Sequence, residues 1–265
     1  MLSHRAFSFC GAALAASLLT GCADGPLGGG PGDDARVQLR FGVSGAPSSS
    51  ARFQTGGTEG LVVTGSNGTL SISDIRLVVA EFELDGDDDV NPCQATGGGD
   101  DCEDFDAGPM FVDLPLAGGP VAVGAGDVPP GVYDEVEFEV EDLDDDEENA
   151  TERQRIEALR QQILAQFPDW PRDASMLVVG TFTPTGGAAR PFRAFVEAEI
   201  EIELGLSPAL TVAEGGTGSL DVTLDPQAIF RSGNTVLDLS TASARTRLEV
   251  EIENGFSGRG RGSDD

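Results

Sequence analysis

The chain contains no lysine, and it has only one histidine, one tryptophan and one tyrosine among its 265 residues. The histidine, His4, lies in an N-terminal segment that we expect to be removed. Nucleophile activation by histidine or lysine, as in Ser-His-Asp, Cys-His and Ser-Lys sites, is therefore not available in its usual forms. Most catalytic zinc sites also depend on histidine. These shortages predict that the protein is not an enzyme.

Paired carboxylates are the one abundant acid–base group that remains, and glycosidases use such pairs. Here they fall in loop runs and on strand faces that we expect to be exposed, where their pKa values should be ordinary. Sugar-binding clefts usually also stack sugars on aromatic rings. We expect Tyr133 to be a corner tyrosine whose hydroxyl bonds backbone, and Trp170 to pack under the end of a helix. A carboxylate-dependent hydrolase is therefore the least favoured function.

Positive charge is scarce as well, with 16 basic residues, all arginine, against 46 acidic ones and a formal net charge of −30. Nucleic acid is excluded as a partner, because binding phosphates relies on neutralising them with Arg and Lys. Electrostatic binding to an anionic lipid face is excluded for the same reason. Cationic partners and divalent metals stay open. The alternative is a solvated, salt-tolerant surface without a ligand.

The N-terminus has the features of an export signal. Residues 6–19 form an apolar segment of signal-peptide length, too short to cross a bilayer as a helix. The tetrapeptide LTGC at 19–22 resembles a bacterial lipobox. This resemblance implies cleavage before Cys22 and lipidation of its thiol, and several acyl chains such as palmitate make an anchor durable. Ala23 favours the outer membrane of the cell envelope; ordinary secretory cleavage nearby is the alternative.

The four cysteines are accounted for by this interpretation. Cys10 leaves with the signal peptide and Cys22 carries lipid, so that Cys93 and Cys102 remain. In an oxidising compartment, two thiols at this spacing predict one disulfide that closes a short loop. Such a loop contributes about 2–3 kcal/mol in the chain-entropy model. A metal pair is the alternative, but no histidine lies nearby and the spacing is not that of a zinc knuckle.

Composition divides the rest of the chain into a folded domain with flexible ends. The expected parts are a signal peptide (1–21), a tether (22–35), a β-sandwich domain (36–256) and a disordered tail (257–265). Two subdomains are the alternative to one domain; they would span 36–143 and 174–256 and be joined by a helix at 149–167.

Apolar and polar residues alternate in several segments of the domain, which indicates strands with one buried and one solvated face. These segments are 37–43, 136–140, 196–204, 220–224 and 248–252. Two further runs, 75–84 and 176–182, are apolar on both parities and predict central strands. Turn signals such as Asn67-Gly68 and Pro130-Gly131 separate the strands. The pattern predicts a mainly β fold, an immunoglobulin- or transthyretin-like β-sandwich.

One segment has a helical period instead. Asn149 and Glu152 form a capping box, and Pro168 ends the segment. The apolar residues between them are spaced for one helix face: Ile156, Leu159, Ile163 and Phe167. We expect a single amphipathic helix that packs on the sandwich or closes one end of it.

The run VPPGVYDEVEF at 128–138 resembles the strand motif of an uncharacterised family of bacterial cell-envelope lipoproteins. Segments 75–79 and 111–114 occur in the order that this family shows, so the resemblance covers residues 36–143. It implies an immunoglobulin- or transthyretin-like sandwich in the cell envelope. The family is a domain of unknown function, so the resemblance implies no activity.

The acidic stretch between residues 85 and 106 is the best candidate for a binding site. Calcium takes about six to eight oxygen ligands, and Asp-x-Asp-x-Asp spacing on a loop places several on one side. The EF-hand pattern is not met, because Val90 stands in place of the turn glycine and Thr96 in place of the bidentate glutamate. We predict either a calcium site outside that pattern or a solvated insertion. The candidate ligands are Asp85, Asp87, Asp89, Asn91, Asp104 and Asp106.

Glutamates occupy one face of three expected strands, at 136–140, 196–204 and 248–252. Like charges directly opposite each other on a sheet are destabilising. We therefore expect the face of the first strand that carries Arg36 and Arg40 to lie beside one of these strands, with salt or divalent ions screening the rest.

Taken together, the sequence predicts a lipid-anchored, extracytoplasmic, non-catalytic binding or adhesion module, with calcium as a candidate stabilising ion. The alternative is a structural or assembly lipoprotein of the cell envelope with a protein partner. The expected partners are the membrane, through the anchor, and envelope proteins or glycans.

Overall fold

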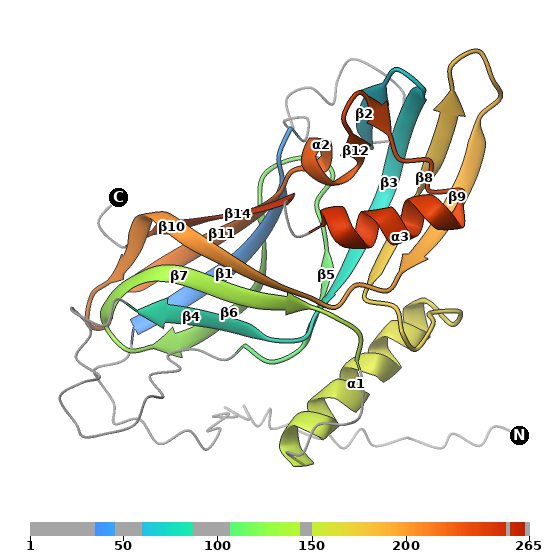
Figure 1. Cartoon of the computed structure of the whole chain (residues 1–265). Coiled ribbons are helices and arrows are strands. Elements are labelled where there is room, and N and C mark those ends of the chain that lie inside the picture. The colour runs from blue at the N-terminus through green and yellow to red at the C-terminus, as the bar shows by residue number, and fades with distance from the viewer. Residues whose placement is uncertain (1–34, 46–59, 87–106, 144–149, 253–254, 263–265) are drawn as a thin grey trace, which may run out of the picture. The chain divides into compact units, whose positions relative to one another are not determined.

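Strands make up most of the described chain, as the alternating pattern predicts. The computed structural model describes residues 35–45, 60–86, 107–143, 150–252 and 255–262. All of these belong to one unit, Pro31–Asp265. The fold is mainly β, a β-sandwich extended by a further sheet and flanked by helices (Figure 1). Within these ranges, no helix is both long enough and apolar enough to cross a membrane.

Four strands form the first layer of the sandwich. They are β1 (Ala35–Val43), β6 (Val121–Val128), β11 (Thr217–Leu224) and β14 (Phe256–Arg261). Their order is β14-β11-β1-β6, and β1 pairs in parallel with β11 and antiparallel with β6. Alternation along β1 buries Val37, Leu39 and Phe41 and leaves Arg36 and Gln38 exposed, as predicted.

Three strands form the opposite layer. They are β4 (Phe82–Gly86), β7 (Gly131–Val140) and β10 (Ile200–Val212), in the order β10-β7-β4. The two layers meet through aromatic rings: the ring centroid of Phe138 lies 5.8 Å from that of Phe41 and 5.3 Å from that of Phe256. Edge-to-face pairs of this kind add to the stabilisation from burial. Phe138 therefore joins β7 to two strands of the first layer.

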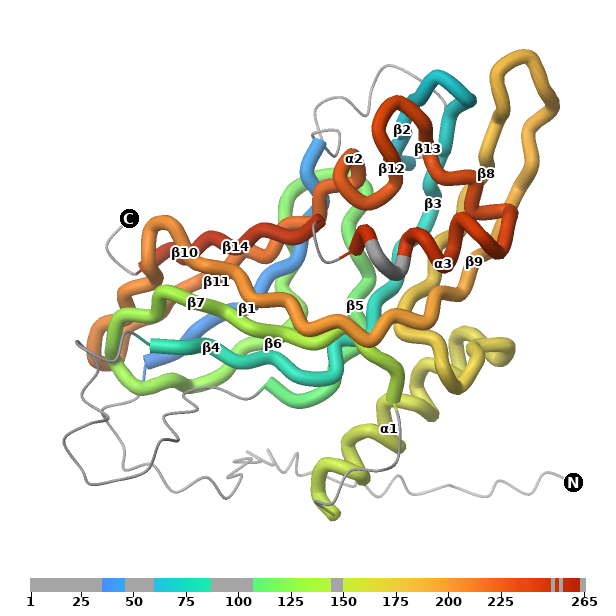
Figure 2. Tube along the Cα trace, viewed as in Figure 1, coloured from blue at the N-terminus to red at the C-terminus, as the bar shows by residue number. Residues whose placement is uncertain are grey.

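A third sheet extends the sandwich. Its strands are β2 (Leu61–Gly65), β3 (Gly68–Val79), β8 (Met176–Pro184) and β9 (Arg190–Val196), with β5 (Met110–Asp113) paired to β3. A short hairpin of β12 (Arg231–Ser232) and β13 (Thr235–Val236) lies beside β2 and β3 (Figure 2). The Asn67 side chain holds it there, because its amide donates to the Val236 carbonyl and accepts from the Val236 N–H, both at 2.9 Å.

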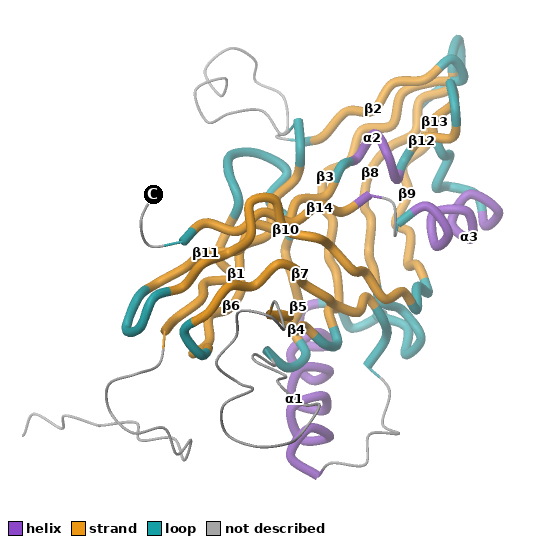
Figure 3. Tube along the Cα trace, turned by 60° about the vertical axis from the view of Figure 1, so that its left-hand side comes forward, coloured by secondary structure: helices purple, strands orange, loops and turns teal. Residues whose placement is uncertain are grey.

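In the part of the chain that the structure describes, three helices lie against the sheets (Figure 3). They are α1 (Ala150–Gln166), α2 (Pro226–Ile229) and α3 (Ala242–Glu251). The apolar face of α1, centred on the buried Ile163, packs on Val78 of β3 and Phe111 of β5. The end of β3 is apolar at successive positions because both of its faces are covered. Leu77 and Val79 face the main core, and α1 covers the other side. The predicted helix is confirmed; its cap residue Asn149 lies outside the described residues.

The expectation of a single helix is wrong, because α2 and α3 were not predicted. The segment 248–252, predicted as a strand, belongs to the end of α3 and the residue after it. Leu248 and Ile252 are both fully buried, and their spacing of four places them on one helix face as well as on one strand face. A segment this short fits both the two-residue period of a strand and the 3.6-residue period of a helix.

Two other segments, each predicted as one strand, contain parts of two consecutive strands. The run 75–84 contains the end of β3 and the start of β4, which belong to different sheets. The run 196–204 likewise contains the end of β9 and the start of β10. The apolar pattern continues from one strand to the next because both strands contribute buried residues to the core, although they belong to different sheets.

The prediction of a disordered tail from Ser257 is wrong, because residues 256–261 form β14. This strand pairs antiparallel with β11, with Phe256 opposite Leu224 at one end and Arg261 opposite Ser219 at the other. The alternative of two subdomains is also contradicted, since each of the three large sheets combines strands from both halves of the chain: β1 with β11, β4 and β7 with β10, and β3 with β8.

Candidate functional site

The outer face of the β10-β7-β4 layer is lined with carboxylates. Backbone pairing sets Glu139 opposite Glu201 and Glu137 opposite Glu203 across β7 and β10. On the other side of β7, Glu83 of β4 lies opposite Glu137. The inward residues of the same strands, such as Phe138, are buried, so the alternation forces every one of these glutamates outward. We call this surface the acidic face.

Three of these glutamates come together at its centre. Carboxylate oxygens of Glu137, Glu201 and Glu203 all lie within 4.8 Å of one another. Glu137 is half-buried, whereas Glu201 and Glu203 are exposed. In the described ranges, no arginine forms an ion pair with any of the three.

The crowding changes how readily these groups ionise. Partial burial, a hydrogen bond with Glu201 and repulsion from Glu201, Glu83 and Asp85 raise the pKa of Glu137 from 4.5 to about 7. Partial burial and neighbouring carboxylates also raise the pKa values of Glu135 and Glu139. The expectation that strand-face carboxylates keep ordinary pKa values is therefore wrong for β7, because each glutamate faces like charges on two sides.

The predicted pairing of Arg36 and Arg40 with a glutamate strand is also wrong. Both belong to the other layer, where Arg36 Nη1 donates to Asp127 Oδ1 at 3.0 Å and Arg40 Nη1 lies 3.4 Å from Asp221 Oδ1. The inward side chains of these strands pack in the core, and solvent reduces the repulsion between the glutamates outside. The two outer faces consequently differ in charge. The first layer carries the arginines of β1 and β14 on its outer face: Arg36, Arg40, Arg259 and Arg261.

The donor set at the centre of the acidic face suits a hard cation. Calcium takes about six to eight oxygens from carboxylates, carbonyls and water, and Glu137, Glu201 and Glu203 supply three that are already close together. Water would complete the shell on the open side. A divalent cation there would relieve the like-charge repulsion and favour the ionised form of Glu137.

The predicted calcium loop begins at this face. Asp85 is the described member of that ligand set, and β4 places it opposite Glu135 of β7. The other five predicted ligands, Asp87, Asp89, Asn91, Asp104 and Asp106, lie outside the described residues, as do Cys22, Cys93 and Cys102. The alternating glutamates were visible in the sequence, but which strands lie side by side was not.

Tyr133 and Trp170 both have the structural roles predicted for them. The Tyr133 side chain is fully buried, and its hydroxyl donates to the Pro129 carbonyl at 2.6 Å. Trp170 packs against the ring of Phe111 at 5.3 Å, and its Nε1–H donates to the Ala174 carbonyl at 2.9 Å.

No protein-family model and no curated protein sequence matches this chain. Among solved structures, the chain is similar to MbnP from Methylosinus trichosporium, with 15% sequence identity and a TM-score of 0.37. The similarity covers 85% of this chain and 97% of that one. A likeness at this level says nothing about what this chain binds. The resemblance of residues 36–143 to a lipoprotein family stays a prediction.

Proposed function

We propose that the protein is a lipid-anchored, non-catalytic binding module of the cell envelope whose acidic face binds divalent cations, calcium first among them. The observation that carries this proposal is the set of three converging carboxylates at Glu137, Glu201 and Glu203. A hard cation is the ligand whose preferred donors match this set. The scarcity of histidine and lysine, described above, argues against catalysis.

The anchor is tested separately from the cation. Mass spectrometry of the N-terminal peptide of the purified protein should find Cys22 as the first residue, carrying diacylglyceryl and acyl groups. Cys22→Ser should release the protein from the membrane fraction. A protein that still begins at Met1, or an unmodified Cys22, contradicts the envelope assignment and leaves the cation site untouched.

Calcium should raise the melting temperature. At about 5 mM calcium and a Kd of about 0.5 mM, typical of extracellular sites, linkage contributes about 1.4 kcal/mol. For a chain of this size that is a shift of about 3–5 °C. Glu137→Gln should abolish the shift, whereas Glu214→Gln, an exposed acid in the turn between β10 and β11, should keep it. A shift that survives Glu137→Gln and disappears in Asp89→Asn would place the ion in the loop instead.

Without metal, the contribution of Glu137 to stability should grow as pH falls from about 8 to about 4.5. Glu137 has a folded-state pKa of about 7, above its ordinary value of 4.5, so the folded state binds the proton more tightly. The gain therefore begins as pH falls through the folded pKa and is complete below the ordinary one. Solvent screening at this open face limits it to about 1 kcal/mol. Urea titrations at several pH values should show a flatter profile for Glu137→Gln than for Glu214→Gln.

The arginines on the opposite outer face favour a second candidate function, an assembly lipoprotein with an acidic protein partner. Arg259 and Arg261 lie two residues apart on the outer face of β14, with Arg40 on the same face. Arg261 and Arg40 both lie near Asp221, at 3.6 and 3.4 Å, so Arg259 carries most of the charge offered to a partner. Charge reversal of Arg259 and Arg261 to glutamate should then abolish a salt-sensitive complex isolated from solubilised envelope. A complex that tolerates the reversal contradicts this function.

A further inference from the structure

The strand β6 forms one edge of the first layer. It pairs with β1, and among the described residues no strand pairs with its other edge. An unpaired edge presents backbone N–H and C=O groups that can bond a further strand. Of the eight residues in β6 only Val128 is buried, whereas Val121 has 40% of its surface exposed. β6 is therefore an open edge along most of its length.

The sequence of β6, VAVGAGDV, has little that would discourage a further strand. Natural edge strands usually carry a charge or a proline within the strand, or are covered by another element. The one charge in β6 is Asp127, near its end, and Arg36 Nη1 lies 3.0 Å from its carboxylate. The register against β1 shifts once, at Val123, which leaves residues 124–128 in regular pairing. This stretch can accept a strand on its open side.

The other edges of the large sheets are protected. The edge strand β9 carries the exposed residues Arg190, Pro191 and Arg193, and a proline cannot donate to a further strand. The edge strand β4 carries two acids, Glu83 and Asp85. β10 and β14 lie against each other, and the β12–β13 hairpin lies beside β2. Among these described edges, β6 lacks both a charge at its centre and a covering element.

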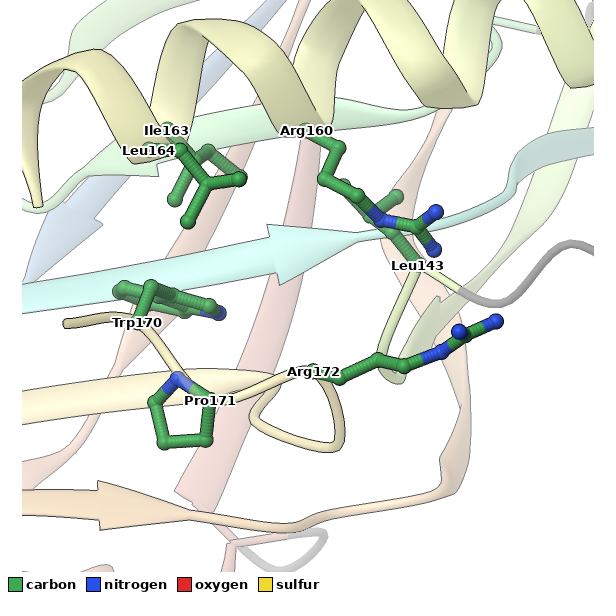
Figure 4. A pocket seen from close by; sticks show the side chains of 7 residues that line it. All are labelled: Leu143, Arg160, Ile163, Leu164, Trp170, Pro171 and Arg172. Carbon is green, nitrogen blue, oxygen red and sulfur yellow. The ribbon is translucent and has the colours of Figure 1, made fainter. Parts of the chain in front are cut away.

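Apolar surface elsewhere is covered from within the chain. Figure 4 shows Ile163 and Leu164 of α1 facing Trp170 and Pro171 across a small pocket beside the third sheet. Trp170 in turn packs on the ring of Phe111 in β5 at 5.3 Å. In the part of the chain that the structure describes, no helix covers β6 in this way.

A glycine within β6 also indicates a neighbour. A Cβ added at Gly124 would meet only Met110 Cε, at 4.0 Å. The described residues therefore give no steric reason for a glycine there, although glycine weakens a strand. A glycine inside a strand often marks the place where another backbone approaches closely.

We propose that β6 pairs with β6 of a second copy of this chain, antiparallel about a two-fold axis near Ala125. The pairing joins the two four-stranded layers into one continuous sheet, and two-fold dimers are the commonest oligomers. Charge favours this occupant. The chain carries a net charge of −30, so most surfaces of two copies repel each other. An axis at Ala125 sets Asp127 opposite Val123 of the second copy, so that no like charges lie directly opposite each other.

The dimer should be weak in solution. A ladder of this length buries less than the roughly 1,200 Å² of stable interfaces, so we expect a dissociation constant on the order of 10–100 µM. The test uses the mature chain with Cys22→Ser, in which no lipid drives association, in EDTA, so that cation binding at the acidic face plays no part. Sedimentation velocity from about 5 to about 500 µM should show monomer giving way to dimer. Added salt should strengthen the dimer because it screens the repulsion between copies.

Variants and hydrogen exchange locate the interface. Ala125→Lys places two lysines opposite each other and should raise the dissociation constant at least about tenfold. Ala125 is exposed, so the variant should keep the melting temperature of the monomer. Val62→Lys, at an exposed position on β2, is the matched control and should leave the dimer intact. In the concentrated protein, hydrogen exchange should slow in residues 121–128 and stay unchanged in β9.

A monomer at every concentration, a dimer that tolerates Ala125→Lys, or slowed exchange only outside β6 would overturn the proposal. Slowed exchange in β6 that requires solubilised envelope, with the chain alone monomeric, would also overturn it and would assign this edge to a strand of another protein.

Discussion

We expect Phe138→Ala to lower the free energy of unfolding by about 4 kcal/mol, the range for truncating a buried phenylalanine. Only 1% of the Phe138 surface is exposed. Its ring meets Phe41 and Phe256 edge-on and stacks on Phe82 at 6.2 Å, so one side chain joins β7 to three other strands. The cavity would lie where the two layers meet, and the surrounding strands could not collapse into it without losing pairing.

Urea unfolding of the purified variant measures this loss. Val62→Ala is the matched control, because Val62 lies on β2 with 56% of its surface exposed, and truncation there should change stability by less than about 0.5 kcal/mol. A loss below about 1.5 kcal/mol in Phe138→Ala, comparable to an Ile→Val change, would mean that the layers do not meet through this ring.

Gly260→Ala should cost about 3 kcal/mol, although alanine normally suits a strand better than glycine. An added Cβ at Gly260 would lie 2.6 Å from Leu210 Cβ and 2.8 Å from Leu210 Cα. Because the obstacle includes backbone of β10, no side-chain rotation relieves it. The glycine is required by the close approach of β10 to β14.

Two matched glycines separate this steric cost from general effects of substitution. Gly258→Ala meets Leu206 Cδ2 at 3.0 Å, a side-chain atom that can move, and should cost less than Gly260→Ala. Gly119→Ala meets nothing within 4 Å and should leave the melting temperature unchanged. If Gly260→Ala has the same melting temperature as Gly119→Ala, β14 does not pack against β10 as described.

The alternating pattern predicted β1, β7 and β11 because each has one face on the core and one in solvent, and burial acts on every second residue. It failed at residues 248–252, where Leu248 and Ile252 satisfy both strand and helix spacing. It also failed at β14, whose glycine- and arginine-rich composition is typical of disorder. There the small residues are dictated by a neighbouring strand, and a neighbour distant in the sequence leaves no local signal.

The candidate sites were predictable to a similar extent. Glutamates on the outward positions of β7 and β10 could be read directly, but their convergence depends on strand order, which is a property of the tertiary fold. Net charge likewise concealed that Arg259 and Arg261 lie on one face and the glutamates on another. Trp170 was correctly expected to pack under a helix end.

The parallel pairing of β1 with β11 places Arg36 opposite Thr217, and the last strand, β14, completes the same sheet. One neighbour of β1, the strand β6, lies in the first half of the chain, whereas the other neighbour, β11, is made only late in synthesis. Local hairpins such as β2–β3 and β8–β9 can form early, but the sandwich closes only after synthesis is almost finished, and such long-range closure is slow. The edge of β1 that pairs with β11 therefore stays unpaired until the C-terminal part of the chain has been made.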